Sequence, residues 1–420
     1  MKIPLTFPGP GAELRVGENG SVSESIVVAE AVTVGGLDVS VETGVSQQND
    51  EHHGPRGPYW SDVSTAAIVY IDNFEDLRYT RTTDGGTTWA DTLIKTGSIN
   101  RIACWFDKET PGDTGTKLHI IYMDFASDTV FYRFLDIASD TARLGTERTI
   151  DNTVTIDFGA GSNRCSITKT VGGNLLTCFQ TTSEIECNRS TDEFATSNDD
   201  RADVYEAAAA DSDYAMLFPA NTADNNDACA VFIDRSAFEV TLKMYDDSAN
   251  TWTEFATIIG AITSSSSISN VDAAVRHSDN HVLVAWHRLI NNGIDDLLTS
   301  DLTVDSIASP TVTAKTDIFT DQDNAARAAM LIDQNNDDVY VAYLKGGTYL
   351  STMDVVFHKS TDGMATWDAE QAYNEADADD IRAVHAGRSV SGAGGHFMPA
   401  WYNEDLTEIF VNLSNDISIA

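Results

Sequence analysis

Seven short apolar runs, each ending on an aromatic residue, recur along the chain at nearly constant spacing. The aromatic residues are Tyr70, Tyr122, Phe179, Phe232, Trp286, Tyr343 and Trp401. Successive members are 52, 57, 53, 54, 57 and 58 residues apart. The runs are too short for helices and are bounded by turn residues, which is typical of β-strands. A fixed period of this length indicates a repeat architecture.

Each repeat contains more than one strand. A turn-rich stretch and another short apolar stretch precede each run, and a third strand follows it. This third strand ends on an aspartate in every unit: Asp84, Asp136, Asp192, Asp247, Asp301, Asp362 and Asp416. A fourth strand follows in most units, and a four-stranded unit of roughly 40–50 residues is typical of a propeller blade. We predict an all-β fold, a β-propeller of seven four-stranded blades, with six blades as the alternative if the irregular fifth unit is a long insertion.

The last repeat lacks room for its fourth strand, because only four residues follow Asp416. Surplus strand patterns occur near the other end of the chain, at residues 25–34 and 37–43. We expect one of them to complete the seventh blade, which ties the two ends and removes an open sheet edge. Residues 1–50 are therefore predicted to form an N-terminal segment with the ring-closing strand and a docking role, and residues 51–420 the propeller.

The chain is strongly acidic, with a formal net charge of −39. Such a surface repels nucleic acid and anionic membranes, so we expect neither nucleic acid partners nor membrane insertion. No run of ~18 apolar residues predicts a transmembrane helix, and the first 20 residues lack the apolar segment of a secretory signal peptide. We expect a virion or an extracellular surface reached without a classical signal peptide, with the cytoplasm as the open alternative.

The five cysteines are odd in number and none has CxxC spacing: Cys104, Cys165, Cys178, Cys187 and Cys229. We interpret them as buried free thiols and expect neither a zinc site nor a disulfide framework. Asp333, Asn335 and Asp337 have the spacing that opens a calcium loop but lack its glycine and distal glutamate. No cofactor is expected; structural calcium stays open without a specified site.

Two loops match the pattern S/T-x-D-x-G-x-x-W, one from Thr82 through Asp84 to Trp89 and one from Ser360 through Asp362 to Trp367. Degenerate copies occur at Asp192, which lacks the tryptophan, and from Asp247 to Trp252, which lacks the glycine. In such a loop the aspartate accepts backbone N–H bonds within a tight turn and the tryptophan buries a large apolar surface. The chain thereby resembles the Asp-box (BNR-repeat) sialidase-like propellers over roughly residues 55–416.

This resemblance implies a β-propeller that is either a glycosidase or a non-enzymatic module of a bacterial or phage surface protein. A sialidase site would need arginines that grip a carboxylate, a Tyr–Glu nucleophile and an acid/base aspartate. Arg56 stands where the family's first arginine opens the first blade, although the usual isoleucine is missing. Tyr402 and Glu404 are a weak candidate pair on one strand face.

Further arginines recur at the starts of first strands, and aspartates recur two places after the aromatic residues. With Arg56 they form the candidate set Arg101, Arg164, Arg327, Arg382, Asp72, Asp124 and Asp234. These side chains either line a pocket for an acidic sugar or form a pseudo-symmetric ring of Arg–Asp pairs that hold the blades in register. Because they repeat with the blades, we favour the ring.

We therefore predict a non-catalytic recognition or scaffold propeller, a tail or capsid component of a phage virion that binds host glycans, a host-surface receptor or other virion proteins. The alternative is a sialidase-type exo-glycosidase that acts on acidic sugars. A third hypothesis is a protein-interaction propeller inside a cell.

Overall fold

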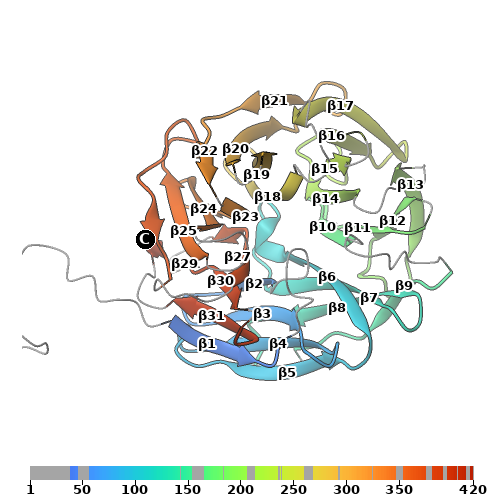
Figure 1. The fold of residues 1–420 in the computed structure, drawn as a ribbon. Coiled ribbons are helices and arrows are strands. Elements are labelled where there is room, and N and C mark those ends of the chain that lie inside the picture. Colours follow the sequence, from blue (N-terminus) through green and yellow to red (C-terminus); the bar gives the residue numbers. More distant parts are fainter. Residues whose placement is uncertain are drawn as a thin grey trace, which may run out of the picture. The chain divides into compact units, whose positions relative to one another are not determined.

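The computed structural model describes residues 38–45, 56–141, 143–153, 165–182, 184–205, 213–234, 237, 239–259, 268–291, 294–323, 325–346, 353–374, 381–390, 395–403, 405–412 and 417–419. Seven sheets, antiparallel except for the short pair of β23 and β28, lie around a common centre (Figure 1). The predicted all-β propeller with seven blades is confirmed, and the six-bladed alternative is wrong. Among the described residues, no helix is long and apolar enough to cross a membrane.

Blades 1 to 4 follow the chain in order, each from its inner to its outer strand. Blade 1 contains β2 (Arg56–Trp60), β3 (Ala66–Ile71), β4 (Leu77–Thr82) and β5 (Ala90–Lys95). Blade 2 contains β6 (Ile99–Phe106), β7 (Lys117–Asp124), β8 (Thr129–Asp136) and β9 (Arg148–Asp151). Blade 3 contains β10 (Cys165–Lys169), β11 (Leu175–Gln180), β12 (Ile185–Ser190) and β13 (Asp199–Tyr205). Blade 4 contains β14 (Tyr214–Pro219), β15 (Ala228–Asp234), β16 (Glu239–Asp246) and β17 (Thr251–Ile259).

Blades 5 and 6 each carry a fifth strand, whereas blade 7 has four. Blade 5 contains β18 (Ile268–Arg276), β19 (His281–Asn291), β20 (Ile294–Thr303), β21 (Thr311–Ala314) and β22 (Phe319–Asp323), which also pairs with β20. Blade 6 contains β23 (Ala325–Asp333), β24 (Asp338–Lys345), β25 (Asp354–Ser360) and β26 (Gln371–Ala372), with the short β28 (Ser389–Val390) beside β23. Blade 7 contains β27 (Ile381–His385), β30 (Ala400–Asn403), β31 (Glu408–Asn412) and β1 (Asp38–Thr43). A two-stranded sheet joins β29 (Gly395–Phe397) to β32 (Ile417–Ile419).

The second strands are apolar on both faces because each blade packs between two neighbours. All six residues of β3 and all seven of β15 are buried. The outermost strand of blade 1, β5, is mostly exposed because solvent covers it. The largest hydrophobic cluster runs through blades 2 to 5 without interruption. Blade-to-blade packing thus explains why the strands read as continuous apolar runs rather than alternating ones.

Strand β1 closes the ring, as predicted. It pairs antiparallel with β31, from Asp38 opposite Asn412 to Thr43 opposite Glu408. Val41 is 7% exposed and belongs to a hydrophobic cluster with residues of blades 1 and 7. The ring-closing strand is therefore the pattern at 37–43, whereas residues 25–34 and Asp416 lie outside the described residues.

The Asp-box loops bond as expected for structural turns. Asp84 accepts bonds from the backbone N–H and the hydroxyl of Thr88, at 2.9 and 2.7 Å. The same two bonds run from the threonine four residues on to Asp192 and to Asp362. These hydrogen bonds to the charged carboxylate lower the pKa of Asp362 to about 2.

The loop of blade 4 departs from this pattern. Asp246, not Asp247, accepts the turn bonds there, from the Ser248 hydroxyl and the Ala249 N–H. Asp247 instead forms an ion pair of 2.6 Å with Arg189 of blade 3. The loss of the glycine moves the turn by one residue and frees Asp247 to connect two blades.

The box tryptophans also connect neighbouring blades. Trp252 Nε1 donates to the carbonyl of Ala202 in blade 3 at 2.9 Å, and Trp367 Nε1 donates to the carbonyl of Thr316 in blade 5 at 2.8 Å. Trp89 Nε1 instead donates within its own turn, to the carbonyl of Gly86.

The expectation that all cysteines are free thiols is wrong. Cys178 and Cys187 form a disulfide between β11 and β12, with a Cα–Cα distance of 4.3 Å. The strand register places them directly opposite each other. Their symmetric placement about the β11–β12 turn was a signal in the sequence that CxxC spacing does not detect. Cys104, Cys165 and Cys229 are free.

Candidate functional site

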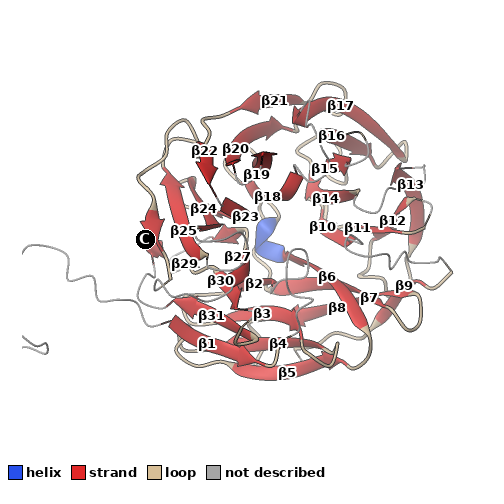
Figure 2. Cartoon of the chain, in the orientation of Figure 1, coloured by secondary structure: helices blue, strands red, loops and turns tan. Residues whose placement is uncertain are grey.

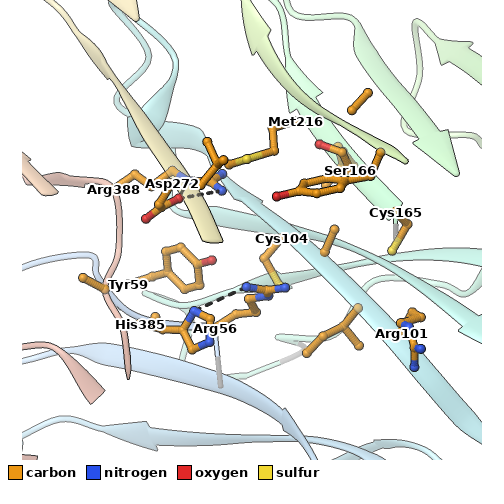
Figure 3. A pocket seen from close by; sticks show the side chains of 18 of the residues that line it. Arg56, Tyr59, Arg101, Cys104, Cys165, Ser166, Met216, Asp272, His385 and Arg388 are labelled. Atoms are coloured by element: carbon orange, nitrogen blue, oxygen red, sulfur yellow. Dashed lines mark hydrogen bonds and ion pairs between the residues drawn. The ribbon is translucent and has the colours of Figure 1, made fainter. Parts of the chain in front are cut away.

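A cavity of about 100 Å³ lies at the centre of the ring. Inner strands of all seven blades contribute to its wall, so it lies on the propeller axis. Its polar lining consists of Arg56, Arg101, Arg388, Asp272, His385, Ser166, Tyr59 and Tyr214, together with the thiols of Cys104 and Cys165 (Figure 3). The remaining lining residues are apolar or glycine.

The polar groups do not form a ring of equivalent positions. In three blades the polar residue of the inner strand lies opposite the residue that directly precedes the recurring aromatic residue of the second strand. These three polar residues are Arg56, Asp272 and His385. Arg101 instead lies opposite the residue that directly follows the recurring aromatic residue of its blade. Register shifts near the starts of the inner strands cause the difference, since a bulge moves one strand relative to its partner and redirects side chains. Arg56 and Arg101 therefore enter the cavity at different depths.

Arg388 is held by an acid and by an aromatic ring. Its Nε and Nη2 atoms lie 3.3 Å from Asp272 Oδ1, and its guanidinium lies over the ring of Phe218 at 5.5 Å. The other oxygen of Asp272 accepts the N–H of Met330 at 2.9 Å. Both oxygens of this carboxylate are thus engaged within the protein.

His385 is held neutral beside the arginines. Arg56 Nη1 lies 3.4 Å from His385 Nδ1 (Figure 3). Burial lowers the pKa of His385 well below its usual value, and the charges of Arg56, Arg327 and Arg388 lower it further. Since a guanidinium only donates, Nδ1 is the acceptor and Nε2 carries the hydrogen. Nε2 is buried and has no hydrogen-bond partner among the described residues.

A short 3-10 turn, η2 (Asp107–Glu109), lies at the centre of the ring directly after the inner strand β6 (Figure 2). Lys108 Nζ donates to the carbonyl of Ser61 in blade 1 at 2.7 Å. Glu109 accepts the N–H of Arg388 at 3.0 Å, and its carbonyl lies 3.4 Å from His277 Nε2 of blade 5. The turn therefore ties blade 2 to distant parts of the ring at the end opposite the starts of the inner strands.

The cavity brings together only part of the predicted site. Arg56 and Arg101 line it. Arg327 is 2% exposed and occupies the register shift of β23 with a φ of 56°, a conformation that arginine rarely adopts. Arg382 occupies the corresponding shift of β27. Arg164 lies outside the described residues.

The predicted aspartates lie at turns between second and third strands. Asp72 accepts the N–H groups of Phe74 and Asp76, at 2.8 and 3.0 Å, and pairs with Arg78. Asp124 accepts the N–H of Ala126 at 2.9 Å, and Asp234 that of Ala237 at 2.6 Å. In these contacts each aspartate caps its own turn.

Other candidates take structural positions. Tyr402 is fully buried, and Glu404 lies outside the described residues. Asp333 accepts bonds from the backbone and side chain of Asn335 within the β23–β24 turn. Among the described residues, no group of three or more metal-ligating side chains could hold an ion.

Sequence reasoning did not identify Arg388, His385 or Asp272. None belongs to a recurring motif, and they meet only because the ring brings blades 5, 6 and 7 together. The sequence predicts Cys104 and Cys165 only as buried thiols, with no place in a site. Burial raises the pKa of the Cys165 thiol to about 12, so it is not a ready nucleophile.

No protein-family model matches the chain, and no curated protein matches it. Several solved structures are similar. A luciferin-regenerating enzyme has 13% sequence identity and a TM-score of 0.43, covering 82% of this chain and 99% of its own. An α-L-arabinanase from Penicillium chrysogenum has 11% identity and a TM-score of 0.40, covering 63% and 98%. The NanB sialidase from Streptococcus pneumoniae has 12% identity and a TM-score of 0.43, covering 91% and 71%. At these values none of them informs the chemistry of the cavity, and membership of the Asp-box family stays a prediction.

Proposed function

We propose that this chain is a non-catalytic recognition propeller on the surface of a phage virion, a tail or capsid component that binds host glycans through one rim of its ring. Other virion proteins are the alternative partners at the same rim. The observation that supports recognition is a set of apolar side chains presented on adjacent turns of blades 7, 1 and 2.

These side chains are unusually exposed for their type. Phe74 is 79% exposed, Phe125 49% and Leu406 48%. They lie on the turns between second and third strands, at the end of the ring where the inner strands begin. We call these three residues the rim triad. Exposed apolar side chains grouped on one surface are typical of interaction sites.

Backbone hydrogen bonds connect the three turns. Four bonds of 2.8–3.0 Å link them in sequence: Val45 to Thr407, Asn73 to Gly44, Ile99 to Glu75, and Phe125 to Ser98. The side chains of Asp72 and Asn403 also accept the N–H groups of Phe74 and Leu406. A surface held in this way loses little conformational entropy when it binds a partner. An apolar ring beside carboxylate and amide groups suits a sugar, which presents both C–H and O–H groups.

The axial cavity supports a non-catalytic role. Glycoside hydrolysis of the common type uses two carboxyl groups. Asp272 is the one carboxylate among the residues that line the cavity, and both of its oxygens are already engaged. Two tyrosines are among the lining residues, and none of the residues that line the cavity is a glutamate.

The test compares a rim variant with a matched control. We expect Phe74→Ser combined with Phe125→Ser to lower binding to host cells or to a glycan array by about tenfold or more, because buried aromatic anchors dominate binding energy. Leu93→Ser is the control, since Leu93 is 40% exposed on the outer strand β5 and lies away from the rim turns. Equal binding by all three proteins would exclude the rim triad. Copies of the chain in purified particles would support the virion assignment.

A sialidase-type exo-glycosidase is the second candidate, because Arg56, Arg101 and Arg388 line one cavity. Hydrolysis of a fluorogenic sialoside by the wild type, with loss in Arg56→Ala, would establish it and overturn the non-catalytic proposal. Folded protein without turnover would leave recognition as the function.

A further inference from the structure

We propose that the rim triad binds its glycan through protonated amino groups, so that the ligand is an amino sugar polymer whose amines are not acetylated. This inference rests on the proposed glycan recognition and adds the chemical class of the ligand. The carboxylates on the turns of the rim triad and its exposed aromatic rings carry the inference.

The turns of the rim triad are rich in acidic residues. Residues 72–76 and 124–128 include five aspartates or glutamates among ten residues and no lysine, arginine or histidine, whereas the whole chain has 65 acidic residues in 420. On the third turn, the exposed Asp405 directly precedes Leu406. Every side chain of the rim triad therefore belongs to a residue within two positions of a carboxylate in the sequence.

Most of this negative charge is not neutralised by neighbouring bases. Four of the carboxylates form no ion pair with any residue that the structure describes: Asp76, Asp124, Asp128 and Asp405. Asp72 pairs with Arg78 at 3.4 Å, but the same guanidinium also pairs with Asp91 of β5. Lys95, where β5 ends, pairs with Glu147 at 2.9 Å. The rim therefore keeps a negative potential, which attracts cations and repels acidic sugars.

The aromatic rings of the rim add a second attraction for cations. Phe74 is 79% exposed and Phe125 49%, so solvent reaches both rings. The negative face of an aromatic ring attracts an ammonium group, and the apolar surface of a sugar packs against the same face. An amino sugar presents both features on one ring, whereas a neutral sugar lacks the charge and an acidic sugar has the wrong one.

The ligand must make several of these contacts because each of them is weak. An exposed ion pair or cation–π contact strengthens binding about twofold to fivefold. A preference of about tenfold for the amine over its neutral form therefore needs two or three such contacts. A polymer with an amine on every sugar can supply them to adjacent turns at once, since backbone hydrogen bonds connect the three turns.

The test is calorimetric titration of the full chain at about pH 5.5, where amines are protonated and exposed carboxylates are ionised. The probes are the tetramer of glucosamine, the tetramer of N-acetylglucosamine, and tetralysine. We expect the glucosamine tetramer to bind about tenfold or more tightly than the other two, with an affinity that falls as salt is added. Equal binding of the acetylated tetramer would overturn the requirement for an amine, and equal binding of tetralysine would overturn the assignment to a sugar.

Matched variants locate the binding at the rim. Asp124→Asn combined with Asp128→Asn should weaken binding of the glucosamine tetramer about fivefold or more, because it removes two rim charges. Asparagine keeps the acceptor that Asp124 offers to the Ala126 N–H and tolerates the φ of 47° at residue 128. The control, Asp140→Asn with Asp305→Asn, removes two exposed carboxylates from third-to-fourth strand connections at the other end of the ring. Equal weakening by both double variants would show attraction to the overall charge and would overturn the site.

The variant that combines Phe74→Ser with Phe125→Ser separates this inference from the proposed function. Loss of host-cell binding in this variant, with equal binding of the two sugar tetramers by the wild type, would retain glycan recognition and overturn the requirement for an amine. Host-cell binding at the wild-type level would exclude the proposed function at the rim, whatever the tetramers show. Loss of host-cell binding together with a preference for the glucosamine tetramer would support both.

Discussion

Glu109 is a buried carboxyl group at the centre of the ring. Its side chain accepts the backbone N–H groups of Arg388 and Phe106, so it fixes the 3-10 turn to the segment that follows β27. Burial raises the pKa of Glu109 to about 7, although the charge of Arg388 opposes the shift. Asp272, which also faces this region, raises it further. The carboxyl group therefore titrates near neutral pH.

The pH dependence of stability should reveal this group. An unfolded glutamate has a pKa of ~4.3, so the raised folded value contributes stability that is complete below that pH and is lost as pH rises through about 7. In Glu109→Gln this loss is absent. The unfolding free energy of the wild type should thus fall relative to the variant between pH ~4.5 and ~7.5, by about 3 kcal/mol at most. Urea denaturation at several pH values measures this difference.

Glu147→Gln is the matched control for that measurement. Burial of Glu147 is outweighed by hydrogen bonds from Tyr122 and Lys95, which lower the pKa of its carboxyl group. Its contribution to stability is present above the unfolded pKa and is lost only in acid, so the difference from wild type should be flat from pH ~5 to ~8. A flat profile for Glu109→Gln as well would contradict the raised pKa.

Strand β1 shows how a single element decides the closure of the ring. It supplies the outermost strand of blade 7, next to β31. Hydrogen bonding alone does not hold it, because Val41 packs in a cluster with Trp60, Tyr402 and neighbouring residues. Closure therefore depends on one face of one short strand.

A charge on that face should open the ring. Val41→Asp is expected to lower the free energy of unfolding by about 3 kcal/mol or more, since it removes apolar packing and places a carboxylate in an apolar cluster. Ser40→Ala, on the exposed face of the same strand, should change stability by less than about 1 kcal/mol. Scanning calorimetry compares both variants with the wild type. An unchanged unfolding midpoint in Val41→Asp would show that β1 does not hold the ring closed.

At the scale of the molecule, the acidic charge opposes the compact ring. With a formal net charge of −39, the folded protein carries self-repulsion that the expanded chain relieves. Ion pairs between blades, such as Arg189 with Asp247, offset only part of it. Dissolved salt screens what remains.

Salt should therefore stabilise the protein. We expect the thermal midpoint to rise by a few degrees between roughly 0.01 and 0.5 M sodium chloride, where the screening length falls below the size of a blade. Free glycine added to the solution at the same concentration should change the thermal midpoint little, because it is zwitterionic and screens charges poorly. A midpoint that falls with salt would mean that attractive ion pairs outweigh the repulsion.

The sequence by itself determined the seven blades, the closure of the ring by an N-terminal strand and the turns of three Asp boxes, whereas the structure selected residues 37–43 as the closing strand and moved the turn of blade 4 to Asp246. These features depend on local patterns: runs of apolar residues, turn residues at fixed offsets, and bonds between residues four positions apart, as in Asp84 and Thr88. The same pattern recurs in every repeat, so a strand that is hard to recognise in one repeat can be predicted from its position in the others. The disulfide between Cys178 and Cys187 also joins residues that are close in the sequence. The prediction of free thiols was wrong because it considered only CxxC spacing.

Only the tertiary structure decided which side chains share the axial cavity. Arg56 meets His385 across 329 residues, and Asp272 meets Arg388 across 116. Such pairs depend on ring closure and on register shifts of one or two residues, which change the depth of a side chain without altering the repeat. For this reason Arg101 and Arg56, which have similar positions in the repeat, enter the axial cavity at different depths. A periodic sequence predicts the blades because they are alike, whereas the cavity depends on the places where they differ.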